Sequence, residues 1–288
     1  MINGAIARVI LVVLCIFPWP ETAFSGETLR GVALVIGQKS YAALPSLPNT
    51  LRDADDIKRL LDRLGFKTDL AGDKTGRQLN RWIDGFIEDA DGADVALVYY
   101  AGHAVEAGGV NYLVPIDADE AALAQAGERL ISLQHVLDRL RSKAKVTLLL
   151  LDACRSNPFP ASSVLKADAV AAGKPISAGG LAIPRGVALI EEGALAPESL
   201  GEVVGYAAAP GQMALDGPTG GNSPYAAALL KHLSANQGYD FGQVMTLVSE
   251  EVYLNTGSRQ RPWVNASLRR FMVFGGAAEE SSSDEAII

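Results

Sequence analysis

The fold is decided by DVALVYYAGHA at residues 94–104 and VTLLLLDACR at residues 146–155. Each stretch begins with an apolar run, the pattern of a strand that is buried on both faces of a sheet. Each run then passes directly to a reactive side chain, His103 in the first stretch and Cys154 in the second. Parallel strands deliver their carboxyl ends to one edge of a sheet. If these two strands are neighbours, we expect the imidazole and the thiol to face each other there.

This pairing favours nucleophilic catalysis over a structural role. A thiol becomes a nucleophile when a base or a cation lies within reach, and a histidine supplies that base. A lone cysteine after a strand is more often a small buried apolar residue. Of the three histidines in the chain, His135 and His232 fall in predicted helices, and only His103 follows a strand and a glycine. The pattern therefore favours a catalytic dyad of His103 and Cys154.

The flanking sequence alternates between strand and helix patterns. Continuous apolar strands separated by amphipathic helices predict an α/β fold with a mostly parallel sheet that helices cover on both faces. The predicted strands are residues 31–36, 66–70, 94–100, 146–151, 203–209 and 270–274, with residues 111–114 as a small hairpin partner; the predicted helices are residues 50–64, 77–89, 132–141, 223–235 and 241–255.

Both ends of the chain are predicted to lie outside the folded domain. Residues 9–17 form a short apolar run and Ala23-Phe24-Ser25 resembles a cleavage site, so residues 1–25 are predicted to be a signal peptide. The alternative, an uncleaved anchor, needs about 20 apolar residues to span a bilayer. We therefore expect export, to a bacterial periplasm or the medium, and a mature chain whose single cysteine is Cys154. Residues 276–288 are predicted to be a disordered acidic tail.

Composition excludes several classes of protein. The chain has 49% hydrophobic residues, which excludes intrinsic disorder, and two cysteines, which excludes a disulfide-rich scaffold. Its net charge of −8 argues against a nucleic-acid partner, which would need a basic face. Neither G-x-G-x-x-G nor G-x-x-x-x-G-K-[ST] occurs, which gives little weight to a nucleotide-binding domain.

Six stretches together resemble the caspase-like cysteine peptidases of clan CD, peptidase C14 type, and most closely the bacterial metacaspase-like, or orthocaspase, branch. The resemblance implies a caspase-hemoglobinase-like three-layer α/β/α sandwich over residues 26–275. A large part, about 26–160, would carry the dyad, a loop of about 156–200 would follow, and a small part, about 201–275, would complete the pocket. The stretches are GVALVIGQKSYAALPSLPNTLRDADDIKRLLDRLGF, DVALVYYAGHA, NYLVPIDA, LLLLDACRSNPF, GYAAAPGQMALDG and GNSPYAAALLKHL.

The resemblance also implies residue roles. Cys154 would be the nucleophile and His103 the general acid and base, with an oxyanion hole made by the backbone N–H groups of Ala104 and Cys154. The family usually has glycine at the position of Ala104, and alanine would be unfavourable if the backbone there needed a positive φ. The chain would then act on protein or peptide substrates as an endopeptidase.

Three carboxylates occupy the positions that decide specificity in the family. Asp53, Asp152 and Asp216 would repel an acidic side chain and accept a guanidinium or ammonium group, so we expect cleavage after Arg or Lys. Two simpler interpretations stay open at this point. In the first, Asp53 is a helix N-cap; in the second, Asp216 only forms a turn with Gly217.

Several alternatives remain open from sequence. Lys166, Lys174 and Arg185, in the 156–200 loop, are candidate self-cleavage positions, although any protease attacks such loops. A weak or inactive caspase-like scaffold is the main alternative function, and Ala104 counts mildly for it. No cofactor or metal site is predicted. A calcium requirement stays open because no spacing of acidic residues marks a dedicated loop, and the oligomeric state cannot be read from the sequence.

Overall fold

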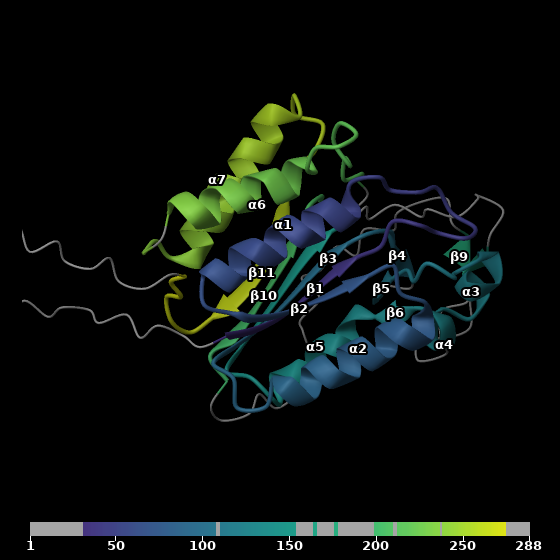
Figure 1. Ribbon diagram of the computed structural model, residues 1–288, viewed down its shortest axis with the longest axis horizontal. Helices are drawn as coiled ribbons and strands as arrows, with labels where there is room; N and C mark the ends of the chain where they lie inside the picture. Colours follow the sequence, from purple (N-terminus) through teal and green to yellow (C-terminus); the bar gives the residue numbers. More distant parts are fainter. Residues whose placement is uncertain are drawn as a thin grey trace, which may run out of the picture.

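The computed structural model describes residues 31–107, 110–153, 164–165, 176–177, 199–209, 212–236 and 238–274. Within them a central sheet has the strand order β11-β10-β7-β3-β1-β2 (Figure 1). All neighbours are parallel except the antiparallel β11. The strands are β1 (Gly31–Gly37), β2 (Lys67–Gly72), β3 (Val95–Ala101), β7 (Val146–Asp152), β10 (Gly201–Tyr206) and β11 (Trp263–Leu268).

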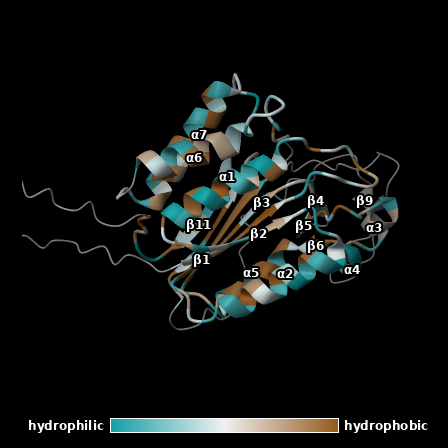
Figure 2. Cartoon of the chain, in the orientation of Figure 1, coloured by the Kyte–Doolittle hydropathy of each residue, from teal (hydrophilic) through white to brown (hydrophobic). Residues whose placement is uncertain are grey.

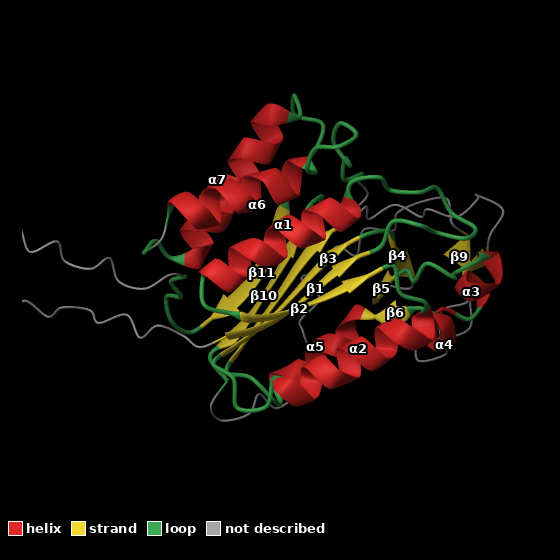
Figure 3. Ribbon diagram, viewed as in Figure 1, coloured by secondary structure: helices red, strands yellow, loops and turns green. Residues whose placement is uncertain are grey.

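Helices cover both faces of this sheet, as the sequence predicts (Figure 3). One face carries α1 (Thr50–Arg63), α6 (Pro224–Ala235) and α7 (Phe241–Asn255), and the other carries α2 (Gly76–Asp89) and α5 (Leu133–Arg141). The result is the expected three-layer α/β/α sandwich. Shorter elements lie beside the carboxyl end of the sheet: the three-stranded sheet of β4 (Ala104–Ala107), β5 (Val110–Leu113) and β6 (Ile131–Ser132), and the helices α3 (Glu120–Ala124) and α4 (Ala126–Arg129).

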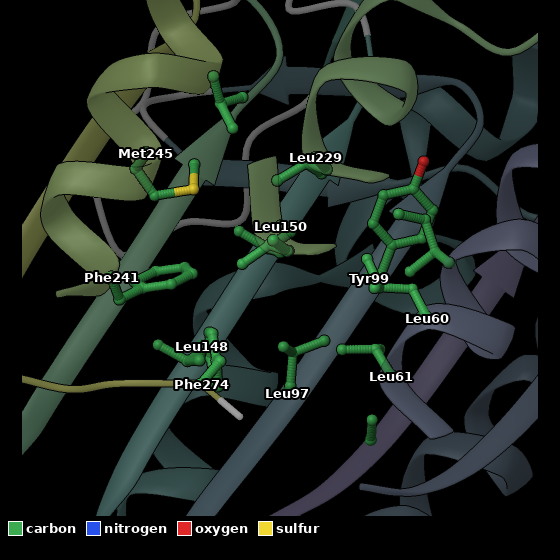
Figure 4. Packing of buried hydrophobic residues seen from close by; sticks show 14 of the residues in the cluster. Leu60, Leu61, Leu97, Tyr99, Leu148, Leu150, Leu229, Phe241, Met245 and Phe274 are labelled. Carbon is green, nitrogen blue, oxygen red and sulfur yellow. The ribbon is translucent and has the colours of Figure 1, made fainter. Parts of the chain in front are cut away.

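Alternate side chains of each central strand supply two separate cores. Leu97 and Tyr99 pack with α1, α6 and α7, as Figure 4 shows, whereas Val98 and Tyr100 pack with α2 and α5. Because both faces are buried, the strands read as continuous apolar runs rather than as alternating ones. In Figure 2 the central strands are accordingly hydrophobic, while the helices carry both hydrophobic and hydrophilic residues.

The pairing of β3 with β7 positions the functional end of the sheet. The two strands run in register from Val95 opposite Val146 to Ala101 opposite Asp152. They therefore end side by side, and the residues that follow them in sequence leave the sheet at the same edge. This arrangement confirms the neighbour relationship that the sequence analysis required.

One predicted strand is wrong. The last strand is not at residues 270–274 but at β11, whose WVNASL sequence lacks an apolar run because most of this edge strand is exposed. The apolar signal of residues 270–274 comes instead from Met272 and Phe274, which are buried against the α7 side of the core. The ring of Phe274 makes edge contacts with Phe66 and Phe241, at centroid distances of 5.5 and 5.0 Å.

The segment of about 156–200 is also not a loop throughout. Short strands β8 (Val164–Leu165) and β9 (Ile176–Ser177) pair antiparallel within it. Several predictions fall on residues outside the described ranges: the signal peptide 1–25, the nucleophile Cys154, the self-cleavage candidates Lys166, Lys174 and Arg185, and the tail 276–288. They stay predictions. Within the ranges that are described, no helix combines the length and the apolar character that a bilayer crossing requires.

The anchoring role of Phe274 can be tested by mutation. Phe274→Ala removes a ring that is only 7% exposed, so the free energy of unfolding should fall by about 3–5 kcal/mol. Phe271→Ala, three residues earlier, removes a ring that is 87% exposed and should change it by less than about 0.5 kcal/mol. Urea denaturation of both variants measures the difference; equal effects would show that residues 270–274 do not anchor the core.

Candidate active site

The carboxyl ends of β3 and β7 meet at a small pocket. Gly102, directly after β3, donates its N–H to the carbonyl of Asp152 at 3.3 Å. His103 and Ala153 both line the pocket, and Ala153 directly precedes Cys154 in the chain. The pocket is small. Its lining residues are Leu47, Thr50, Asp53, Gly102, His103, Asp152, Ala153, Ala214, Leu215, Asp216 and Ser223.

His103 is held in one tautomer by a backbone carbonyl. Its Nε2 lies 2.9 Å from the carbonyl oxygen of Pro45 in the β1–α1 loop. A carbonyl can only accept, so Nε2 carries the hydrogen and Nδ1 of the neutral ring is left as the base. Burial lowers the pKa of His103, although the Pro45 carbonyl and the charge of Asp216 oppose this effect. A lowered pKa favours the neutral ring, which is the form that accepts a proton.

The three predicted carboxylates come together in this pocket from separate elements. Asp53 comes from the first turn of α1, Asp152 is the last residue of β7, and Asp216 lies between β10 and α6. Their convergence beside His103 is what the family resemblance implies for Asp53 and Asp216, and what the spacing from Cys154 predicts for Asp152. The structure adds how each carboxylate is held.

Asp53 is buried with one oxygen unpaired. Its Oδ1 accepts from the side-chain Nδ2 of Asn222 and from the backbone N–H of Ser223, each at 3.0 Å. Its Oδ2 has no hydrogen-bond partner among the described residues. The helix-cap alternative is wrong, because Asn49 occupies the N-cap position of α1 and the Asp53 carboxylate is bonded to the start of α6 instead.

Asp152 is fixed by two hydroxyl donors. Tyr99 donates to its Oδ2 at 3.1 Å, and Ser223 donates to the same oxygen through a short hydrogen bond. Ser223 is also the N-cap of α6, where its hydroxyl accepts from the N–H of Ala226. One serine thus ties the carboxylate at the end of β7 to the beginning of α6.

Asp216 is held against the start of α1 by Asn49. The Asn49 N–H donates to Asp216 Oδ2 at 3.3 Å, and its side-chain Nδ2 donates to the Asp216 carbonyl at 2.6 Å. Gly217 follows with a φ of +78°, and an added Cβ there would lie 2.4 Å from the Asn222 carbonyl oxygen. The turn in this segment lies after Gly217, where the Gly221 N–H donates to the Pro218 carbonyl, so the simpler alternative of an Asp216–Gly217 turn is not seen; Asp216 lines the pocket.

Burial raises the pKa of all three carboxyl groups. Burial, followed by the charge of Asp152, raises the pKa of Asp53 to about 8. Burial raises the pKa of Asp152 to about 6, against the hydrogen bonds from Ser223 and Tyr99. Burial also raises the pKa of Asp216. The empty pocket therefore retains protons near neutral pH, and a cation that enters would favour their release.

Ala104 is compatible with the local backbone. It begins β4 in extended conformation, and the positive-φ residues other than glycine in the described part of the chain are Asp73 and Ser258. The expected penalty for alanine is therefore not incurred. The Val114 N–H donates to the His103 carbonyl, so Ala104 and Leu113 form a non-hydrogen-bonded pair of the antiparallel ladder. The Ala104 N–H therefore points away from β5.

Sequence reasoning missed several residues that build this site. Pro45 acts through its carbonyl, which leaves no signal in residue type. Ser223 had a usable signal, since Ser followed by Pro marks the start of a helix. Asn49 and Asn222 had none, because their partners are far away in sequence. No cluster of three His, Cys, Asp or Glu side chains suited to a metal ion occurs among the residues that the structure covers.

Comparison with known proteins agrees with this geometry. The family model of the caspase domain, peptidase C14, matches residues 30–273. The chain belongs to this family. It is therefore a caspase-like cysteine peptidase of clan CD, as the sequence resemblance implied.

Individual relatives show how far the similarity extends. The human mucosa-associated lymphoid tissue lymphoma translocation protein 1 is 33% identical over 125 residues, and its mouse homologue 34%. Each match covers 43% of this chain but only 15% of the relative. The crystal structure of caspase-1 from Spodoptera frugiperda shares the fold, with a TM-score of 0.61, 19% identity, and coverage of 88% of this chain and 93% of that one.

The unpaired oxygen of Asp53 gives a pH-dependent prediction. A carboxyl whose pKa is raised from 3.8 to about 8 binds protons more tightly when folded, so stability falls as pH rises through that window. Asp53→Asn removes the charge and should raise the free energy of unfolding by about 1–3 kcal/mol at pH 8, and by less at pH 5. Denaturant titrations at both pH values measure this difference.

A matched control is Asp55→Asn on the same helix, which removes an exposed carboxylate. It should change the free energy of unfolding by less than about 0.5 kcal/mol at either pH. If Asp53→Asn destabilised the protein more at pH 8 than at pH 5, the buried carboxylate would be stabilising as an anion, which contradicts this assignment.

Proposed function

We propose that this peptidase uses a dyad of His103 and Cys154 and cleaves peptide bonds after Arg or Lys. The observation that carries the proposal is the pocket in which three carboxylates meet beside His103, one of them with a buried oxygen that has no partner in the described part of the chain. Such an arrangement suits a substrate cation better than an acidic or an apolar side chain. The acidic pocket also favours the bacterial metacaspase-like, or orthocaspase, branch expected from sequence.

The chemistry follows from the tautomer of His103. Its Nδ1 takes the proton of the Cys154 thiol, and the thiolate attacks the carbonyl carbon of the scissile peptide. The carbonyl oxygen becomes an oxyanion, which the N–H groups of Ala104 and Cys154 would stabilise. His103 then passes its proton to the leaving amine as the C–N bond breaks. Water, activated by His103, hydrolyses the thioester and restores the thiol.

Specificity follows from charge and burial. A guanidinium offers donors to the unpaired Oδ2 of Asp53 and a counter-charge to Asp152 and Asp216. Removal of one partner from a desolvated charged pair typically costs about 2–5 kcal/mol, so a neutral side chain in this pocket should lose at least about 30-fold. An aspartate side chain would add a further carboxylate to the three already present and should be excluded.

The alternative of an inactive scaffold loses its main support. Ala104 suggested an impaired oxyanion hole, but in extended conformation it offers the same N–H as glycine. The proposed reaction therefore does not require glycine at this position.

Matched fluorogenic peptides test the proposal. Purified chain, residues 26–288, is assayed on peptides that differ only in Arg, Lys, citrulline or Asp before the scissile bond, with and without calcium. Arg and Lys should be cleaved at least about 30-fold better than citrulline. The KM for Arg should fall as pH rises through 6 to 8, where Asp152 and Asp53 ionise.

Cys154→Ala should abolish every one of these activities. Preference for Asp, equal cleavage of citrulline and Arg, or activity retained in Cys154→Ala would overturn the proposal. Intact masses of the same two preparations report self-processing after Lys166, Lys174 or Arg185. A fragment that appears in both preparations is made by another protease.

A further inference from the structure

We propose that Tyr41 is a positioning residue for His103, acting through its hydroxyl on the backbone of the general base. This inference rests on the proposed function of His103 and extends it to a residue outside the dyad and the carboxylate pocket. Tyr41 lies in the β1–α1 loop, 62 residues before its partner, and its side chain is buried.

The Tyr41 hydroxyl accepts the hydrogen bond from the His103 N–H, a bond that the carbonyl of a neighbouring strand would accept within a sheet. The His103 N–H donates to Tyr41 Oη at 2.8 Å, at the point where the chain has left β3 and has not yet entered β4. A buried N–H without an acceptor is unfavourable, so this bond fixes where the backbone can turn. The ring of Tyr41 also packs against the imidazole, with centroids 4.6 Å apart.

A second tyrosine completes the arrangement. Tyr100 Oη donates its hydrogen toward the carbonyls of His103 and Val114, at 2.6 and 3.1 Å. Both carbonyls can only accept, so in the 3.5 Å contact between the two hydroxyls Tyr41 is the donor. Burial raises the pKa of Tyr41, which keeps this hydroxyl protonated. The peptide N–H and C=O of His103 are thus both held by tyrosine hydroxyls.

Gly102, directly before His103, has no room for a side chain. A Cβ added at Gly102 would lie 2.6 Å from Tyr100 Oη and 2.7 Å from Tyr41 Oη. Glycine is therefore required here because the hydroxyls approach the backbone, even though Gly102 does not have a positive φ. The hydroxyl pair and the glycine form one unit that sets the position of His103.

The loop that carries Tyr41 is itself anchored. Asp73 Oδ1 accepts from the N–H groups of Lys39 and Ser40, at 2.7 and 3.0 Å, and the Ala42 N–H donates to the Ile116 carbonyl at 2.8 Å. Pro45, whose carbonyl holds His103 Nε2, follows in the same loop. One anchored loop therefore fixes the backbone, the ring face and the tautomer of His103.

Tyr41→Phe tests the role of the hydroxyl while it keeps the ring. The expected result is a fall in kcat of about 10- to 100-fold, the usual effect of misplacing a catalytic group, with KM changed less than about 2-fold. The acidic limb of the kcat/KM profile should move to higher pH, since looser packing admits water and relieves the burial that lowers the His103 pKa. Tyr112→Phe, in the same apolar cluster, is the control and should leave the profile unchanged.

An NMR titration of the imidazoles separates this inference from the proposed function. In a Cys154→Ala background, Tyr41→Phe should raise the pKa of His103, and this readout needs no peptidase activity. If wild type cleaves no peptide, the proposed function fails while the titration still decides the role of Tyr41. Tyr100→Phe should shift the same values in the same direction, and it decides the question if Tyr41→Phe does not fold. The inference is overturned if Tyr41→Phe changes neither kcat nor the His103 pKa, or if Tyr112→Phe lowers kcat as much as Tyr41→Phe does.

Discussion

The parallel pairing of β3 with β7 is the constraint on which the rest of the site depends. Because Ala101 lies opposite Asp152, the two strands end together, and in the sequence His103 and Cys154 each follow after one intervening residue. The buried apolar runs that fix the sheet also fix where the chain leaves β3 and β7, just before His103 and Cys154 in the sequence.

Three carboxylates lie beside this edge, two of them buried and Asp216 partly buried, and their removal from water works against stability. The structure reduces that penalty with donors from neighbouring elements: Ser223 and Tyr99 for Asp152, and Asn49 for Asp216. Among the described residues, Asp53 Oδ2 has no hydrogen-bond partner. Selection for stability alone would favour an asparagine at this position or a donor to this oxygen, so its retention supports the substrate-binding role that we propose for Asp53.

The sequence predicts the sandwich and the carboxylate pocket because their signals are local or positional. Apolar runs such as VTLLLL identify buried strands, and Asp152 is placed by its distance of two residues from Cys154. Prediction fails where the physical cause lies elsewhere in the chain. The exposed edge strand β11 has no apolar run, whereas the apolar residues Met272 and Phe274 serve as core anchors outside any strand. Pro45 contributes a carbonyl, and Tyr41 contributes a hydroxyl whose partner is a distant peptide, so residue type alone cannot reveal either.

The claim that His103 activates Cys154 is tested most directly by the pH dependence of alkylation at Cys154. Iodoacetamide labelling is compared between wild type and His103→Ala, and peptide mass spectrometry counts Cys154 separately from Cys15. The control is His135→Ala, on the exposed side of α5. The account predicts an inflection at least about one unit below the ordinary thiol pKa of about 8.5, retained in the control and lost in His103→Ala. Identical profiles for wild type and His103→Ala would contradict it.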